Sequence, residues 1–197
     1  MKNTNNKVRL SVASYLNDPI RVPRMYCFIY SILSQTHQNF EIILHHDGPI
    51  NDPNLKNSIE SLSDKIKVLD NLERKGSWGH YHRWPTATIN DDADWVVFTN
   101  DDNYYVPTFL ETMIHYATTY NSEFVYCDHL HDGLGYAVLN AIPEPNYIDM
   151  GAFLTSMNLV KTNSWDTYID IADGIYAKKL ALNTTPVKVP GVLFVHN

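Results

Sequence analysis

Two adjacent carboxylates follow an apolar run in the middle of the chain, a pattern typical of a metal or ligand site. Residues 95–99 (Trp-Val-Val-Phe-Thr) predict a buried strand, and polar residues follow it: Asn100, Asp101, Asp102 and Asn103. In an open α/β sheet, ligands bind beyond the carboxyl ends of the strands. Asp101 and Asp102 repel each other unless positive charge lies between them, and a divalent cation is the usual remedy. The same residue types are also frequent in solvated turns.

Positive charge is concentrated in residues 73–83, just before this strand. The segment has two glycines, which allow close backbone approach, and three cations suited to a phosphate: Arg74, Lys75 and Arg83. A solvated basic loop is the alternative interpretation. The chain of 197 residues has a formal charge of −7, so a polyphosphate ligand needs a local source of positive charge, such as a metal ion. The acidic balance argues against nucleic-acid binding.

Alternating strands and helices must position these residues. The first half predicts a strand at 8–15, a helix at 21–35, a strand at 40–44, a weak helix at 54–62 and a strand at 66–69. The second half predicts a helix at 107–120, strands at 123–127 and 150–157, a helix at 175–182 and a strand at 192–195. A long irregular stretch, 128–147, is expected to cover a binding site. The alternation favours an α/β fold with a mostly parallel sheet.

Composition and length predict one globular domain. Apolar residues make up 44% and charged residues 19% of the chain, which is ordinary for a folded protein. Cys27 and Cys127 are expected to be buried thiols rather than a disulfide. Neither a signal-peptide pattern nor an apolar run of transmembrane length is present, so a cytoplasmic location is expected.

Several segments together resemble family 2 glycosyltransferases of the GT-A fold. They are Ser-Val-Ala-Ser-Tyr at 11–15, Ser-Ile-Leu-Ser-Gln-Thr at 31–36, Phe-Glu-Ile-Ile-Leu-His-His-Asp-Gly at 40–48 and the acidic segment at 99–107. Their order matches that family over about residues 7–110. The resemblance implies a single GT-A domain with a mixed, mostly parallel sheet flanked by helices. Residues 1–105 would then form the nucleotide-binding half, and residues 106–197 the acceptor and catalytic half.

The resemblance also implies how the donor is bound. Tyr15 would stack on the nucleotide base and Asp47 would hydrogen-bond to it, with Ser14 and Gly48 in the same pocket. Arg74 would approach the base or the phosphates, together with the adjacent Lys75. In the acidic segment, Asp101 would lie near the ribose and the metal, and Asp102 would bind Mn²⁺ or Mg²⁺.

Inverting members of that family use a carboxylate base near the start of a late helix, usually as the second residue of a Glu-Asp pair. Asp173 is the matching residue, but Ala172 stands where the Glu is expected. Asp170 and Asp149 are therefore alternative bases, and Asp173 is also a plausible helix cap. His196 matches a histidine that reaches the metal or the diphosphate in some members, although a terminal histidine can equally be frayed.

The sequence thus predicts a metal-dependent glycosyltransferase that moves a sugar from a nucleotide-sugar, with UDP as the expected nucleotide, to a hydroxyl acceptor such as a glycan, with inversion. Two alternatives stay open. One is a glycosyltransferase-like domain that binds a nucleotide or glycan without turnover. The other is a sugar nucleotidyltransferase, which usually needs a Gly-rich basic loop after the first strand. The remaining histidines lack the cysteine spacing of a structural zinc site. No aromatic side chain is assigned a role.

Overall fold

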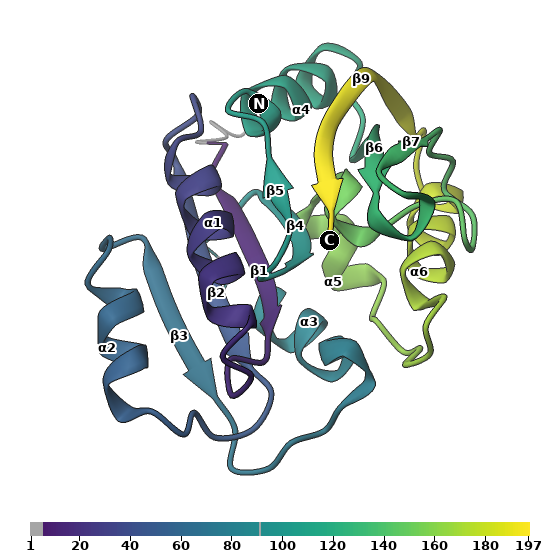
Figure 1. Cartoon of the computed structure of the whole chain (residues 1–197). Coiled ribbons are helices and arrows are strands. Elements are labelled where there is room, and N and C mark those ends of the chain that lie inside the picture. Colours follow the sequence, from purple (N-terminus) through teal and green to yellow (C-terminus); the bar gives the residue numbers. More distant parts are fainter. Residues whose placement is uncertain (1–5, 91) are drawn as a thin grey trace.

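The computed structural model describes residues 6–90 and 92–197, and is built around one nine-stranded, curled sheet (Figure 1). The strand order is β3-β2-β1-β4-β8-β6-β9-β5, with β7 paired to β6. The strands are β1 (Val8–Ser14), β2 (Phe40–His46), β3 (Ile66–Asp70), β4 (Trp95–Asn100), β5 (Tyr104–Tyr105), β6 (Phe124–His131), β7 (Ala137–Leu139), β8 (Phe153–Ser156) and β9 (Val187–His196). The α-helices are α1 (Arg21–Leu33), α2 (Pro53–Glu60), α3 (His80–Ala87), α4 (Phe109–Thr119), α5 (Met157–Thr162) and α6 (Ala172–Leu182). Short 3-10 turns are η1 (Ser77–Gly79), η2 (Asp132–Leu134) and η3 (Met150–Ala152).

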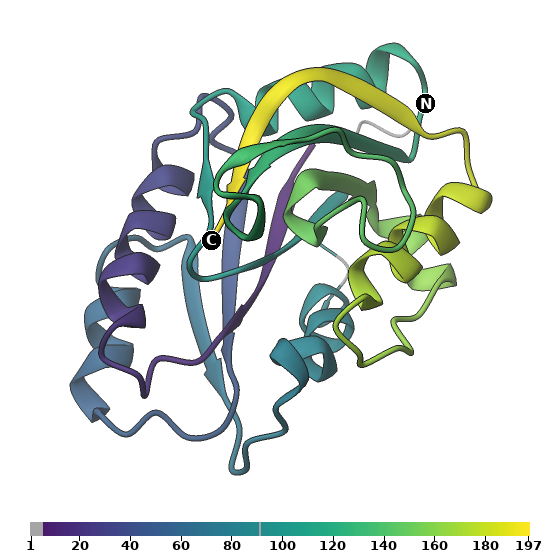
Figure 2. The same ribbon diagram turned by 45° about the vertical axis from the view of Figure 1, so that its right-hand side comes forward.

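The first half of the sheet is parallel, as the alternation of strands and helices predicts. β1 lies between β2 and β4, and β3 extends the sheet beyond β2. Ser11 of β1 donates a hydrogen bond to the carbonyl oxygen of Arg83 in α3 at 2.8 Å, so this face of β1 is covered by α3. Because side chains alternate along a strand, the neighbouring Leu10 faces the opposite side of the sheet. Helix α1 lies on that side (Figure 2). The carboxyl ends of β1, β2 and β4 therefore meet at one edge, between α1 and α3.

The second half of the sheet is mixed. β8 pairs antiparallel with β4 and β6, β5 pairs antiparallel with β9, and β6 and β9 are parallel with an irregularity at residues 127–129. Buried aromatic rings join the two halves: the centroid of Phe153 lies 6.3 Å from that of Phe98 and 5.1 Å from that of Phe124. One continuous apolar core therefore runs beneath both halves.

Residues 128–147 are more regular than the sequence predicts. β6 continues to His131 and forms a hairpin with β7. Polar side chains in this strand have tertiary partners that periodicity cannot reveal. The Asp128 carboxylate accepts a hydrogen bond from the backbone N–H of Ala141 at 2.7 Å, and its Oδ1 lies 2.7 Å from Lys188 Nζ. His129 is fully buried, with its ring centroid 5.5 Å from that of Phe194.

Other elements also differ from the predictions. The basic segment 73–83 contains η1 and the first turn of α3, α6 begins at Ala172 rather than 175, and β9 begins at Val187 rather than 192. Residues 150–157 divide into η3 and β8 before α5 begins. Cys27 is exposed on α1, so its predicted burial is wrong, whereas Cys127 is buried. Within residues 6–90 and 92–197, every helix is too short or too polar to cross a lipid bilayer.

Arg9 is a fully buried cation in the middle of β1. Its guanidinium donates to Glu41 Oε1 at 2.7 and 2.8 Å and to the carbonyl oxygens of Ala87 at 2.9 Å and Asn90 at 3.1 Å. Replacement by an apolar side chain of similar length removes the donors but keeps most of the volume. We expect Arg9→Met to lower the free energy of unfolding by about 2–4 kcal/mol, because the buried acceptors lose their partner.

Urea denaturation followed by circular dichroism measures this change. Lys67→Met is the matched control, since Lys67 is an exposed cation on β3, and its effect should stay within about 0.5 kcal/mol. Equal transition midpoints for Arg9→Met and Lys67→Met would show that Arg9 does not stabilise the fold.

Candidate active site

Two adjoining cavities open at the carboxyl ends of the parallel strands. The smaller, of about 310 Å³, is called here the β1 pocket, and its polar walls include Ser14, Tyr15, Arg21, Asp47 and Arg74. The larger, of about 470 Å³, is called the acidic pocket, and its walls include His131, Asp149, Asp170, Asp173 and His196. Trp78 and Asn100 line both cavities. A ligand that fills both would therefore pass between these two residues.

Asp47, directly after β2, anchors the wall of the β1 pocket. Its two carboxylate oxygens accept hydrogen bonds from the backbone N–H groups of Lys75 at 2.7 Å and Gly76 at 2.8 Å. His82 Nε2 lies 2.9 Å from Asp47 Oδ1. Burial opposes ionisation, but the hydrogen bonds from His82 and the two backbone groups outweigh it and lower the pKa of Asp47. The charged carboxylate therefore holds residues 75–76 against the end of β2.

Arg74 covers one face of the Tyr15 ring, with the guanidinium carbon 3.8 Å from the ring centroid. Gly48 makes this approach possible: its φ is +94°, and a Cβ at that position would lie 3.2 Å from the backbone N of Arg74. A nucleotide base can stack on this face of Tyr15 only after the Arg74 side chain, which is 59% exposed, moves away.

The predicted donor-binding residues thus fall into two groups. Ser14, Tyr15, Asp47 and Arg74 line the β1 pocket. Gly48 instead lies behind Arg74, and the Lys75 ammonium lies 3.6 Å from Glu73 Oε2. The contribution of Lys75 to the pocket is its backbone N–H rather than its charge.

The acidic pair after β4 is bound by one arginine that the sequence did not reveal. Arg21 Nη2 lies 2.8 Å from Asp102 Oδ2 and 3.4 Å from Asp101 Oδ1. Asp101 is fully buried and also accepts a hydrogen bond from Ser14 Oγ at 2.5 Å. Burial raises the pKa of Asp101 to about 6 and also raises that of Asp102. Arg21 begins α1 and belongs to no local motif, so only the tertiary structure brings it to the pair.

The donor atoms around Asp102 and His196 are of the kind that a divalent cation binds. Asp102 Oδ1 is buried and has no hydrogen-bond partner among the described residues, so one hard oxygen donor remains unused. Asn197 directly follows His196, and its Nδ2 donates a hydrogen bond to the Asp102 carbonyl oxygen at 2.8 Å. This hydrogen bond brings the end of β9 beside Asp102. His131, Asp132 and His196 also offer ligand atoms within 4.8 Å of one another. Carboxylate and imidazole donors of this kind suit Mn²⁺, and the residues present fit such an ion.

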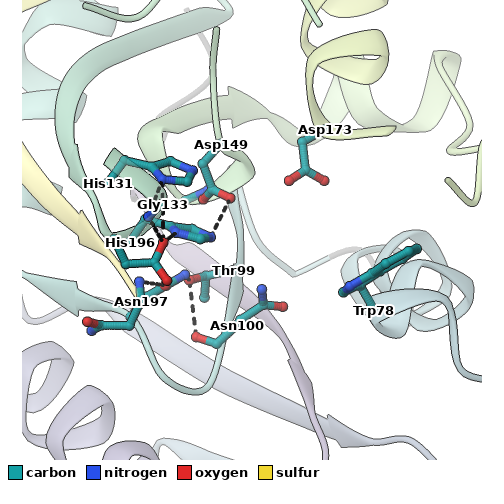
Figure 3. Close-up of polar contacts among 12 residues, drawn as sticks. Trp78, Thr99, Asn100, His131, Gly133, Asp149, Asp173, His196 and Asn197 are labelled. Atoms are coloured by element: carbon teal, nitrogen blue, oxygen red, sulfur yellow. Dashed lines mark hydrogen bonds and ion pairs between the residues drawn. The ribbon is translucent and has the colours of Figure 1, made fainter. Parts of the chain in front are cut away.

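His196 lies between two carboxylates at the rim of the acidic pocket (Figure 3). Its Nδ1 is 2.9 Å from Asp132 Oδ1, and its Nε2 is 3.5 Å from Asp149 Oδ2. Asp149 is held in turn by the backbone N–H of Gly151, which donates to Oδ1 at 2.7 Å. His196 is therefore not frayed in this structure, since both of its ring nitrogens face an acidic partner.

Asp173 lies in the first turn of α6 and faces the acidic pocket. Burial, and then the neighbouring Asp149 carboxyl, raise the pKa of Asp173 well above its usual value, and the positive charge of Arg83 acts in the opposite direction. The backbone beside it is tightly packed, because a Cβ on Gly174 would lie 2.4 Å from Pro145 Cα. Asp170, the other predicted alternative, is exposed and accepts a hydrogen bond from the N–H of Ile171.

Arg83 does not meet a phosphate, so that prediction from the basic segment is wrong. It is buried in α3 and donates to three acceptors: the carbonyl oxygen of Thr99 at 3.0 Å, that of Trp78 at 3.0 Å and Asn100 Oδ1 at 2.8 Å. Its Nε also donates to His80 Nδ1 at 3.1 Å. Burial, followed by the charge of Arg83, lowers the pKa of His80 to about 3. Arg83 therefore ties the end of β4 to the wall between the two pockets.

Trp78 and Asn100, which line both cavities, were not assigned a role from the sequence. The only sequence signal for Asn100 is its place at the end of an apolar strand. The signal for Trp78 is its position between Gly76 and Gly79, which hints at an unusual backbone but gives no direction for the side chain.

Comparison with known proteins agrees with this architecture. The family model described as "Glycosyl transferase family 2" matches residues 22–140. Among curated proteins, the chain is 29% identical over 138 residues to the UDP-Glc:alpha-D-GlcNAc-diphosphoundecaprenol beta-1,3-glucosyltransferase WfaP of Escherichia coli. That match covers 68% of this chain and 52% of WfaP, so the chain spans about half the length of this relative.

Solved structures share the fold at low sequence identity. TarS 1-349 of S. aureus superposes with a TM-score of 0.78 at 15% identity, covering 97% of this chain and 60% of that one. The same fragment has also been solved in complex with UDP. Mannosyltransferase PcManGT of Pyrobaculum calidifontis, in complex with GDP-Man and Mn²⁺, gives a TM-score of 0.74 at 15% identity, covering 99% of this chain and 57% of that one. The GT-A fold expected from the sequence is therefore confirmed. Because the family model covers more than half of its residues, this chain belongs to glycosyl transferase family 2.

Proposed function

We propose that the chain transfers a sugar from a UDP-sugar to a hydroxyl group of an acceptor, with inversion at the anomeric carbon and with a divalent metal ion. One observation carries this proposal: the β1 pocket and the acidic pocket adjoin at Trp78 and Asn100. A nucleotide-sugar can then lie with its nucleotide at Tyr15 and its sugar toward Asp173.

The nucleotide end is supported by the residues of the β1 pocket. Tyr15 offers an aromatic face once Arg74 moves, and a displaced Arg74 guanidinium can meet a phosphate. UDP is chosen because WfaP is named for UDP-Glc and TarS has been solved with UDP, whereas PcManGT has been solved with GDP-Man. The nucleotide is therefore the part of this proposal that a binding experiment must settle first.

Asp102 and His196 are the proposed metal ligands, and the unused Oδ1 of Asp102 supports this role. A bound Mn²⁺ or Mg²⁺ would supply positive charge that offsets the diphosphate and stabilises the departing nucleoside diphosphate. Arg21 complements this role, because it keeps Asp101 and Asp102 together in the absence of a ligand.

Asp173 is the proposed base. It accepts the proton of the acceptor hydroxyl while the acceptor oxygen attacks the anomeric carbon from the side opposite the nucleoside diphosphate. The bond between the anomeric carbon and the diphosphate oxygen breaks in the same step, which gives inversion. The raised pKa of Asp173 favours proton uptake near neutral pH.

Replacing the proposed metal ligand tests the donor site. Asp102→Asn keeps the shape of the side chain but weakens its hold on a cation. We expect the variant to lose the Mn²⁺-dependent part of its UDP affinity, about tenfold or more. Calorimetry with UDP, with and without Mn²⁺, measures this change. Asp64→Asn, in an exposed turn before β3, is the control. An unchanged Mn²⁺ effect in Asp102→Asn would remove Asp102 from the site.

Replacing the proposed base tests the chemistry. In a donor-hydrolysis assay, Asp173→Asn should lower kcat by about 10²- to 10⁴-fold, because no group then takes the proton, while UDP affinity stays near that of the wild type. Asp170→Asn and Asp149→Asn are run in parallel. A larger loss in either of them would reassign the base. Metal-dependent UDP binding without UDP release by the wild type would instead support a non-catalytic binding domain.

The pH profile provides a further test. A raised pKa keeps Asp173 protonated, and so inactive as a base, over a wider acidic range than for an ordinary aspartate. The kcat of donor hydrolysis should therefore still rise with pH between about pH 5 and pH 7, where an unperturbed aspartate is already fully ionised. A flat profile over this range contradicts the assignment.

A further inference from the structure

Residues 76–79 have an unusual backbone where the two pockets meet. All four have positive φ angles: 73° at Gly76, 53° at Ser77, 51° at Trp78 and 75° at Gly79. Glycine adopts such angles readily, but serine and tryptophan rarely do, so the segment is strained at its two central residues. Strain of this kind persists only where the surroundings enforce it, and it is concentrated at ligand-binding sites.

Buried charges enforce this conformation from both sides. On one side, the Asp47 carboxylate accepts the backbone N–H of Gly76 at 2.8 Å. On the other, Arg83 Nη2 donates to the Trp78 carbonyl oxygen at 3.0 Å. Gly79 lies directly against β1, since a Cβ there would be 2.5 Å from Ala13 Cβ. The backbone of the segment is therefore fixed, and the direction of the Trp78 Cα–Cβ bond is fixed with it.

The indole of Trp78 points into the space that a ligand would use. The residue is 66% exposed, unusually high for a tryptophan, and it lines both pockets. Figure 3 shows it across an open space from His196, with Asp173 above and Asn100 below, between the two side chains. Among the described residues, the aromatic ring beside it is that of His80, which is tilted and has its centroid 6.2 Å away. An aromatic face therefore remains uncovered at the junction.

We propose that Trp78 forms a stacking subsite for the sugar ring of the donor. The inference rests on the proposed function: with the nucleotide at Tyr15 and the base at Asp173, the transferred sugar must occupy the junction between the pockets. The C–H groups on one face of a pyranose ring are apolar and pack well on an aromatic face, whereas its hydroxyl groups lie at the ring edge.

Asn100 supplies a polar partner for that edge. Its Oδ1 accepts a hydrogen bond from Arg83 Nη2 at 2.8 Å, which fixes the orientation of the amide and leaves Nδ2 as a donor toward a sugar hydroxyl. The same guanidinium thus positions both Trp78 and Asn100. The Trp78 ring and the Asn100 amide, both held by Arg83, together define a subsite for an uncharged, hydroxylated ring.

The test compares UDP with UDP-sugars on the full chain. Calorimetry in the presence of Mn²⁺ uses UDP, UDP-glucose and UDP-GlcNAc with the wild type, Trp78→Ala, Trp78→Phe and Trp78→Gly. We expect Trp78→Ala and Trp78→Gly to weaken the better-bound UDP-sugar about tenfold and UDP less than twofold, with Trp78→Phe near the wild type. The glycine variant suits the positive φ, so it separates loss of the ring from backbone strain. Tyr120→Ala, an exposed aromatic residue at the end of α4, is the control.

Indole fluorescence gives a second readout. Binding of the UDP-sugar, but not of UDP, should change the emission of the wild type, and Trp78→Phe should lack this difference. Equal weakening of UDP and UDP-sugar in Trp78→Ala, or no weakening of either, overturns the stacking subsite while the proposed donor site stands. Failure of the wild type to bind UDP or any UDP-sugar overturns the proposed function and the subsite together.

Discussion

The site depends on the compensation of negative charge by two arginines. Asp101 and Asp102 lie together after β4, and Arg21 pairs with both of them. Arg83 is buried among carbonyl oxygens, where Asp173 and Asp149 favour its charge against the cost of burial. Without these guanidinium groups, the carboxylates at this edge would repel one another. The two arginines therefore stabilise the close approach of the acidic side chains after β4 and near the start of α6.

The balance leaves an acidic surplus that is part of the proposed chemistry. The lining of the adjoining pockets has four carboxylates, those of Asp47, Asp149, Asp170 and Asp173, against the two guanidinium groups of Arg21 and Arg74. In addition, Asp102 Oδ1 has no partner among the described residues. A bare diphosphate would be repelled by such a site, so the surplus favours a ligand that arrives with a cation. Burial, and after it the neighbouring Asp149 carboxyl, raise the pKa of Asp173. The negative charge around the pockets therefore adds to the effect of burial on proton uptake.

The sequence predicts the parallel half of the fold well because its strands are apolar runs that end in polar residues. Asp47, Asp101 and Asp102 could be found in this way, since each follows such a strand. The same reasoning fails where polar residues are buried by tertiary contacts, as in β6. The expectation that Arg83 meets a phosphate fails for the same reason, because its buried partners are fixed by the tertiary structure. Arg21 and the direction of Trp78 depend on long-range packing and on backbone angles, for which the sequence has no periodic signal.

The close contact between Gly174 and Pro145 joins the first turn of α6 to the segment that follows β7. Gly174 immediately follows Asp173, and a Cβ there would lie 2.4 Å from Pro145 Cα, so α6 rests directly on the segment after β7. That segment also lines the acidic pocket through Asn146 and Ile148. A change in the length or course of this segment would shift the Asp173 carboxylate as well as the pocket wall. Sequence changes at this rim are therefore constrained, because any new contact there must keep the start of α6 in place against Pro145.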